Sequence, residues 1–296
     1  MSALAALPGV LDEHLIDILN GLAIGMLLFT LAVGLSLIFG LADVLNLAHG
    51  AIYLLGGYVA FEVVVERGHS FWLALPVAAA VGLVLGTALA GSLWPIRNRG
   101  HLDQALLTLG LTFIIADAAS IFWGNDYQSI PTPPALFRSE IIFDQFYPRY
   151  RLGVMAVGFV LAILVYLLFE RTQLGAVLRA AVEDRAMVSA LGINVGLIVV
   201  GVLALGAALA AFGGVVGAPI LGLGPQIDAQ VLILALMVVV IGGLGSIQGA
   251  FIGAILIGET QSLGVALVPE FAAFTLFGVM AIVLAIRPEG LFGSKA

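Results

Sequence analysis

The chain has 296 residues, of which 62% are hydrophobic and only 10% are charged, with 18 acidic against 11 basic side chains. Soluble domains carry about a quarter charged residues, so this composition predicts a membrane protein, and the acidic balance argues against nucleic acid as a partner. The chain has no cysteine, which excludes disulfides, thiolate catalysis and cysteine-bound metals.

Apolar windows predict an all-α fold: a polytopic transmembrane helical bundle of about eight to ten spans, forming one domain over residues 1–296. A crossing needs roughly 20 apolar residues. The 229–243 window is short for that, and is either a full crossing or a half-helix that ends inside the protein. The windows lie at 17–40, 48–65, 71–94, 103–123, 152–170, 196–218, 229–243, 249–267 and 271–287.

With nine crossings, the basic residues divide unequally between the two faces of the membrane. One face receives Arg97, Arg99, Arg171, Arg179, Arg185, Arg287 and Lys295, and the other receives Arg67, Arg138, Arg149 and Arg151. Basic residues are enriched on the cytoplasmic side. We therefore expect the N-terminus outside and the C-terminus inside. Residues 1–17 contain no Lys or Arg, so they lack the basic region of a cleavable signal peptide.

Two stretches interrupt the apolar windows in a similar way. "FGLADVLNLAHGAIYLLGG" (39–57) and "IGGLGSIQGAFIGAILIGE" (241–259) both place a glycine-containing polar break before a Gly-Ala pair and a new apolar run. Gly50–Ala51 aligns with Gly249–Ala250. Such interruptions at corresponding positions of two halves are typical of discontinuous helices near a substrate path.

Several polar side chains lie within or beside the apolar windows, where each costs at least a few kcal/mol unless it faces a cavity or a partner helix. They either line a hydrated substrate path or act as helix caps and interhelical hydrogen bonds. His49 has no second histidine at ligand spacing, and no catalytic or nucleotide-binding motif is present, so we expect no metal, no cofactor and no enzyme activity. The candidates for a translocation path are Asp43, Asn46, His49, Asp117, Glu259 and Gln261.

The largest external loop, residues 124–151, contains four prolines and is predicted to be irregular. Its aromatic residues are typical of the belt at a membrane interface. The loop is either a plain connection with interfacial anchors or a docking surface for an extracytoplasmic partner. The residues that fit this belt, in the loop and just before it, are Trp123, Tyr127, Phe146, Tyr147 and Tyr150.

Residues 171–196 form a polar segment between two spans, on the predicted cytoplasmic face. Residues 175–191 are predicted to form one helix, with apolar side chains on one face and Arg179, Glu183 and Arg185 elsewhere. Gly192 is placed to stop that helix. The helix either lies on the membrane surface or fits a groove on a soluble partner.

The stretch "AVEDRAMVSALGINV" (181–195) resembles the cytoplasmic coupling-helix loop of ABC-importer permeases. More closely, the chain is similar to the branched-chain amino acid (LivH-type) permease family. Matching pieces run in family order from the first span to the end: "GLSLIFGLADVLNLAHGAIYLLGGYVA" (34–60), "VIGGLGSIQGAFIGAILIGE" (240–259) and "RPEGLFG" (287–293).

The resemblance implies a permease subunit of an inner-membrane ABC importer for hydrophobic or branched-chain amino acids. It implies three protein partners besides membrane lipid: cytoplasmic P-loop ATPase subunits, a second permease subunit (the same or a related chain) and an extracytoplasmic substrate-binding protein. The polar segment 171–196, called the coupling segment below, would dock on the ATPase through Glu183, Asp184, Arg185 and Gly192. The alternatives are a stand-alone secondary transporter or channel with a relay through Asp117 or Glu259, and a permease of the same family for urea or short amides.

Overall fold

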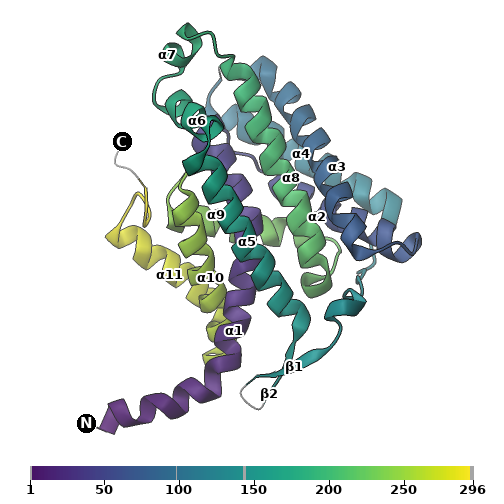
Figure 1. Cartoon of the computed structure of the whole chain (residues 1–296), viewed down its shortest axis with the longest axis vertical. Coiled ribbons are helices and arrows are strands. Elements are labelled where there is room, and N and C mark those ends of the chain that lie inside the picture. The colour runs from purple at the N-terminus through teal and green to yellow at the C-terminus, as the bar shows by residue number, and fades with distance from the viewer. Residues whose placement is uncertain (1, 98, 143–144, 294–296) are drawn as a thin grey trace.

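The structure is a computed structural model that describes residues 2–97, 99–142 and 145–293, with side chains from residue 14 onward apart from that of Arg185. In this part of the chain it is a helical bundle with one two-stranded antiparallel hairpin (Figure 1). The elements are α1 (Ser2–Leu37), α2 (His49–Phe61), α3 (Phe71–Leu93), α4 (His101–Trp123), β1 (Ser139–Ile142), β2 (Gln145–Pro148), α5 (Arg149–Arg171), α6 (Gln173–Glu183), α7 (Arg185–Ala190), α8 (Val195–Leu221), α9 (Ile227–Gly242), α10 (Ile247–Leu267) and α11 (Ala272–Ile286).

Seven of the nine predicted windows are helices long and apolar enough to cross a membrane, among the described residues. The other two are shorter. Helix α2 has 13 residues, although a π-helical turn over Glu62–Glu66 prolongs it, and α9 has 16. The seven spans are His14–Ala42, Phe71–Ile96, His101–Trp123, Arg149–Arg171, Val195–Leu221, Ile247–Leu267 and Pro269–Ile286.

The most extensive helix pairs are α1 with α10 and α3 with α8. Glycines let these backbones approach closely: a Cβ on Gly25 would meet the carbonyl of Ala254, and one on Gly82 would meet that of Ala207. Small residues at interfaces are how helices associate in lipid, where burial of apolar surface gives no net gain. The glycine-rich composition is therefore a packing feature.

The two ends of the bundle are distinct. Helices α6 and α7 protrude at one end, and the β1–β2 hairpin lies at the other (Figure 1). The hairpin is fixed to the bundle because the buried Tyr147 hydroxyl donates to the Leu19 carbonyl at 2.9 Å. Burial raises the pKa of Tyr147, against a smaller opposing effect of Arg151, so this hydroxyl stays a donor.

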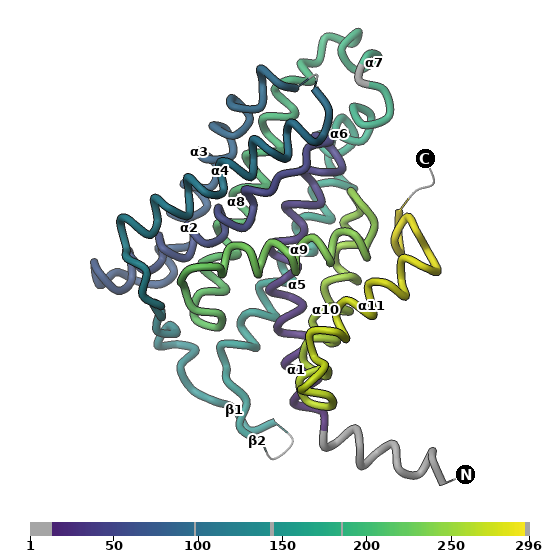
Figure 2. Tube along the Cα trace, turned by 180° about the vertical axis from the view of Figure 1, so that it is seen from behind, coloured from purple at the N-terminus to yellow at the C-terminus, as the bar shows by residue number. Residues whose placement is uncertain are grey.

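Helix α9 crosses the middle of the bundle (Figure 2). It follows Leu223, which pairs with Gln128 of the external loop, and it ends beside Gly245, which packs on Gly40 next to α6. The C-terminal segment joins this second end, since Leu291 and Phe292 donate to the carbonyls of α9's last residues. The C-terminal segment and the coupling segment therefore share one face of the bundle, as the charge pattern predicts.

The prediction of an irregular external loop was wrong over residues 139–148, which form the hairpin apart from its undescribed tip. Two of its aromatic residues also depart from the predicted interfacial belt. Tyr147 and Tyr150 are buried in the protein, and the Tyr150 hydroxyl donates to the Val216 carbonyl at 2.8 Å. Tyr127 and Phe146 are exposed, which fits the belt.

Candidate coupling segment and polar path

The coupling segment is fastened to the C-terminal end of α5. Thr172 caps α6, its side chain accepting from the Gly175 N–H at 3.2 Å. The Arg179 guanidinium donates to the Phe169 carbonyl and lies 3.5 Å from Glu170 Oε2. Gly175 packs directly on the Phe169 carbonyl, so any side chain there would force the two helices apart. Movement of α6 must therefore be transmitted to α5.

The predicted single helix over 175–191 was wrong, because the structure divides it at Asp184. Asp184 is extended (φ −147°, ψ 92°), and its carboxylate accepts the Met187 N–H at 2.9 Å, which starts α7. Aspartate is a preferred N-cap, and here that preference outweighs continuing the helix. Glu183, the last residue of α6, is exposed. Arg185 begins α7, and its side chain lies outside the described part.

Helix α7 forms a short knob at the end of the bundle, with apolar side chains turned outward. Met187 is 63% exposed and Leu191 is 71% exposed, whereas Val188 is buried. Gly192 ends the knob at φ +83°, a backbone conformation that other residues rarely adopt. The predicted helix stop at Gly192 is confirmed. An exposed apolar knob on a polar segment is suited to a groove on another protein.

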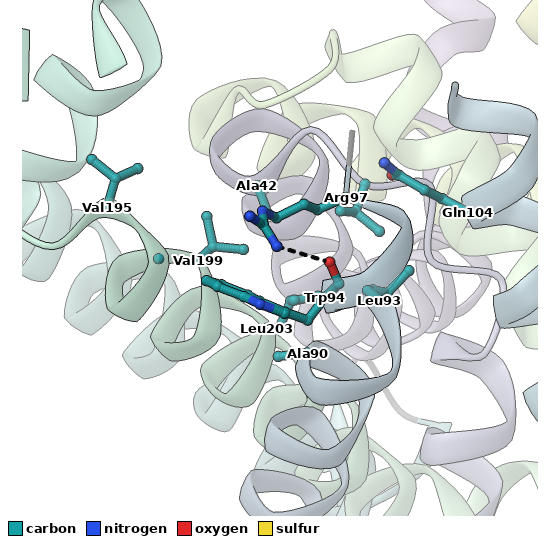
Figure 3. A pocket seen from close by; sticks show the side chains of 11 residues that line it. Ala42, Ala90, Leu93, Trp94, Arg97, Gln104, Val195, Val199 and Leu203 are labelled. Atoms are coloured by element: carbon teal, nitrogen blue, oxygen red, sulfur yellow. Dashed lines mark hydrogen bonds between the residues drawn. The ribbon is translucent and has the colours of Figure 1, made fainter. Parts of the chain in front are cut away.

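The coupling segment leads into a cavity of about 260 Å³ at the start of α8 (Figure 3). Asn194 caps α8 by accepting the Leu197 N–H at 3.3 Å. In Figure 3, Val195 and Val199 line one side of the cavity, and the Arg97 guanidinium lies over the Trp94 ring on the other, 4.2 Å from its centroid. Displacement of the coupling segment would change the width of this cavity.

The first break, residues 43–48, runs between α1 and α2 and is held by α4. The Thr108 hydroxyl accepts the Leu47 N–H at 3.1 Å and lies 3.1 Å from the Leu45 carbonyl. The Thr112 hydroxyl donates to the Leu47 carbonyl at 3.0 Å. The backbone N–H and C=O groups of an extended segment lack the hydrogen bonds that a helix would supply. Inside a bundle they therefore need side-chain partners such as these.

The three candidate residues of the first break differ in role. Asn46 is buried, and its Oδ1 accepts the Ala48 N–H at 3.1 Å in a turn just before α2, while its Nδ2 has no partner among the described residues. His49 is buried, and its Nε2 donates to the Leu31 carbonyl at 3.0 Å, which ties α2 to α1. Asp43 is exposed at φ 58°, with its Oδ2 3.9 Å from His101 Nε2. These contacts favour a structural role for both buried residues: Asn46 bonds the backbone before α2, and His49 forms an interhelical hydrogen bond.

Asp117 lines a different, smaller cavity of about 160 Å³ nearer the external loop. A second carboxylate that the sequence reading missed, Asp228 in the first turn of α9, lines it too. Asp228 is only 9% exposed and forms no hydrogen bond or ion pair within the described residues. The α9 N-terminus stabilises an anion by at most about 2 kcal/mol.

Glu259 and Gln261 lie on α10, away from the first break. The Glu259 carboxylate packs against Gly21 of α1. The Gln261 Oε1 is buried without a hydrogen-bond partner among the described residues. Nearby, the Ser262 hydroxyl donates to the Asp17 carbonyl at 2.6 Å. This group belongs to the α1–α10 interface.

The structure therefore does not gather the candidate residues into one site. The residues of the first break lie near the end of the bundle that carries the coupling segment. Asp117 lies near the external loop, and Glu259 lies between α1 and α10. No cluster of metal-ligating side chains occurs in the described part of the chain. The missed residues did leave signals: Thr108 and Thr112 are one helical turn apart in an apolar helix, and Asp228 follows a Gly-Pro turn at the start of an apolar run.

Comparisons with known proteins find related sequences and one solved structure with partial overlap. LivH, a high-affinity branched-chain amino acid transport system permease protein of Escherichia coli, is 26% identical over 294 residues, which cover 93% of this chain and 94% of LivH. LivM of the same organism is 27% identical over 320 residues, covering 97% of this chain and 72% of LivM. A solved structure, PsaBC from Streptococcus pneumoniae in complex with Fab, overlaps 92% of each chain with a TM-score of 0.48 and 13% identity.

A family model described as "Branched-chain amino acid transport system / permease component" matches residues 17–285, which include every predicted span except the last two residues of the ninth. This chain is a multi-pass membrane protein that belongs to the family of permease components of branched-chain amino acid transport systems.

Proposed function

We propose that the chain is the permease subunit of an importer that carries branched-chain amino acids across the bacterial inner membrane, driven by ATP hydrolysis on partner subunits. The family supports the transport role. The sequence contains no nucleotide-binding motif, and its single lysine is Lys295, so ATP must be hydrolysed by another chain.

The observation that carries this proposal is the exposed α7 knob. Met187 and Leu191 present apolar surface at the end of the molecule that the basic residues assign to the cytoplasm. Glu183 lies at the base of the knob, Asp184 starts it and Gly192 ends it. In the proposed complex the knob, with Arg185 in its first turn, sits in a groove of a P-loop ATPase. ATP-driven closure then moves α6 and α5 through the Arg179 and Gly175 contacts.

A second permease subunit completes the proposed path. LivH and LivM of Escherichia coli carry the name of one transport system, and this chain is similar to both. That supports a pair of related chains, although a pair of identical chains is also compatible with the family. Much of the apolar surface of α4 and α11 is exposed and would face the second subunit or lipid.

An extracytoplasmic binding protein would deliver the amino acid at the opposite end. The hairpin gives the external loop a defined surface there, with Phe137 and Phe146 each more than three-quarters exposed. Uptake measured with leucine, isoleucine, valine and urea would separate the proposed substrate from the urea alternative. ATP-dependent uptake of urea but of none of the amino acids would overturn the substrate assignment.

Co-purification tests the docking role. The chain is co-expressed with P-loop ATPase genes of its own genome, and the membrane complex is purified in mild detergent. We expect the parent chain to retain an ATPase subunit, and Glu183→Lys and Gly192→Pro to lose it, because one reverses a charge at the knob and the other forbids φ +83°.

The matched control is Glu270→Lys, which reverses an exposed carboxylate at the far end of α10. This variant should retain the ATPase subunit. If no ATPase subunit accompanies a folded parent chain, or if both knob variants retain it fully, the docking proposal is wrong.

A further inference from the structure

A small polar cavity lies under the external loop, between α2, α4 and the start of α9. Its volume is about 160 Å³. Its polar lining comes from Tyr58, Asp117, Ser120, Gln226 and Asp228, and its apolar lining includes Leu54 and Ala119. The Tyr127 ring of the external loop packs on Gly224 above it, and the Tyr127 hydroxyl donates to the Pro225 carbonyl at 3.4 Å. The cavity therefore lies directly below the surface at which a substrate would arrive.

Asp228 is the unusual group in this cavity. It is buried and has no hydrogen-bond donor or cation partner within the described residues, although it lies in the first turn of α9. The α9 N-terminus offsets only part of the cost of its burial. Gly50 packs on the Asp228 backbone carbonyl, so α2 holds this turn in place. Asp228 is therefore a mostly buried residue whose carboxylate lines the cavity without a counterion among the described residues.

The lining favours an organic ammonium group as that counterion. Asp117 supplies a second carboxylate at the rim, where it is exposed, and the Tyr58 and Ser120 hydroxyls supply further acceptors for N–H donors. The apolar residues beside them suit the carbon atoms next to the nitrogen. The volume is below the roughly 300–1,000 Å³ of pockets that enclose a whole ligand. It suits the charged head of an amino acid better than the complete molecule.

We propose that this cavity binds the ammonium group of the amino acid as it enters the permease, with Asp228 as the counterion and Asp117 at the rim. The inference rests on the proposed function, because it takes the ligand to be the transported amino acid. It gives a substrate-contacting role to Asp228 and names the chemical group that the outer part of the path recognises.

The first test is leucine uptake by the complete transporter in proteoliposomes. Asp228→Asn should lower uptake roughly tenfold or more, because it removes a charged hydrogen-bond partner of the ligand. Asp228→Glu keeps the charge and should retain part of the uptake. Glu270→Gln removes an exposed carboxylate between α10 and α11, outside both the cavity and the external loop, and should leave uptake unchanged. Normal uptake by Asp228→Asn would overturn the assignment.

The second test reads the cavity directly in the purified complex and does not depend on transport. An apolar carbodiimide modifies buried carboxyl groups, and modification of Asp228 is measured by peptide mass spectrometry. Isoamylamine, which is leucine without its carboxylate, should protect Asp228, whereas isocaproate, which is leucine without its amine, should not. If isoamylamine protects Asp228 but the parent transporter does not take up leucine, the ammonium site is supported and the proposed function is wrong. Leucine uptake without any protection, or equal protection by sodium ions, would overturn the ammonium site.

Discussion

At the residue scale, the polar groups of this chain divide into those that satisfy its own backbone and those that the protein leaves unpaired. Thr108 and Thr112 form hydrogen bonds to the extended first break, and the Asn46 side chain accepts the Ala48 N–H in the turn before α2. Asp228 has no such partner within the described residues. In a membrane protein the first class stabilises the fold, and the second class marks where a ligand or partner is needed.

Thr108→Val tests the structural class. Valine keeps the shape of the side chain but leaves the Leu47 N–H and the Leu45 carbonyl without their partner, which costs about 1–3 kcal/mol for each buried group. We expect the melting temperature of the purified protein to fall by several degrees. Thr87→Val is the control, because the Thr87 hydroxyl is exposed and donates only to Leu83 of its own helix. Equal melting temperatures for the two variants would contradict this role of Thr108.

Composition and motif position predicted the polar residues within spans but not what each one contacts. Both Asn46 and Asp117 stood out in the sequence as polar residues in apolar surroundings. Only the structure shows that the Asn46 side chain bonds the backbone before α2, whereas Asp117 lines a cavity between α4 and α9. Asp228 was missed because it lies just outside its apolar window. Its burial depends on α2, which is distant in sequence.

At the scale of the elements, the coupling segment is two short helices and not one. Its polar composition and its stop at Gly192 could be predicted, because glycine at a helix end is a local signal. The division at Asp184 could not be predicted. Whether this residue continues the helix or becomes extended (φ −147°) and caps a new one depends on a close competition between the two conformations. The result is a separately capped knob at the end of α6, with its apolar side chains exposed to a partner.

Gly175→Ala tests whether α6 acts as a lever on α5. The new Cβ would collide with the Phe169 carbonyl and move α6 away from α5. We expect leucine uptake to fall several-fold while the assembled complex continues to hydrolyse ATP. Gly201→Ala is the matched control, because a Cβ there meets nothing within 4 Å and the residue lies in an ordinary helix. Unchanged uptake per ATP hydrolysed in Gly175→Ala would contradict the lever.

At the scale of the whole molecule, length and hydropathy predicted the bundle but not the geometry of the windows 48–65 and 229–243. Helices α2 and α9 have 13 and 16 residues, and α9 crosses the middle of the bundle between the Leu223–Gln128 pair and the contact of Gly245 with Gly40. An apolar window cannot distinguish a helix surrounded by protein from one that faces lipid. Most of α9 is buried by its neighbours, and that information lies in the tertiary structure.

The absence of cysteine makes the orientation directly testable. Met187→Cys and Phe146→Cys each place one thiol at an exposed position, at opposite ends of the bundle. In intact cells a membrane-impermeant maleimide should label Phe146→Cys only, and in inverted membrane vesicles it should label Met187→Cys only. Ala207→Cys, which is fully buried, is the unlabelled control. The reverse labelling would contradict the assignment of the coupling segment to the cytoplasm.

The central claim is that this permease moves branched-chain amino acids only with a partner ATPase. The most direct measurement is uptake of labelled leucine into proteoliposomes that contain the chain alone or the chain with its ATPase, second permease and binding-protein partners. We predict accumulation only in the complete set, only with ATP on the side of the coupling segment, and none with an ATP analogue that cannot be hydrolysed. Leucine accumulation by the chain alone, without ATP, would contradict the account and favour a stand-alone transporter.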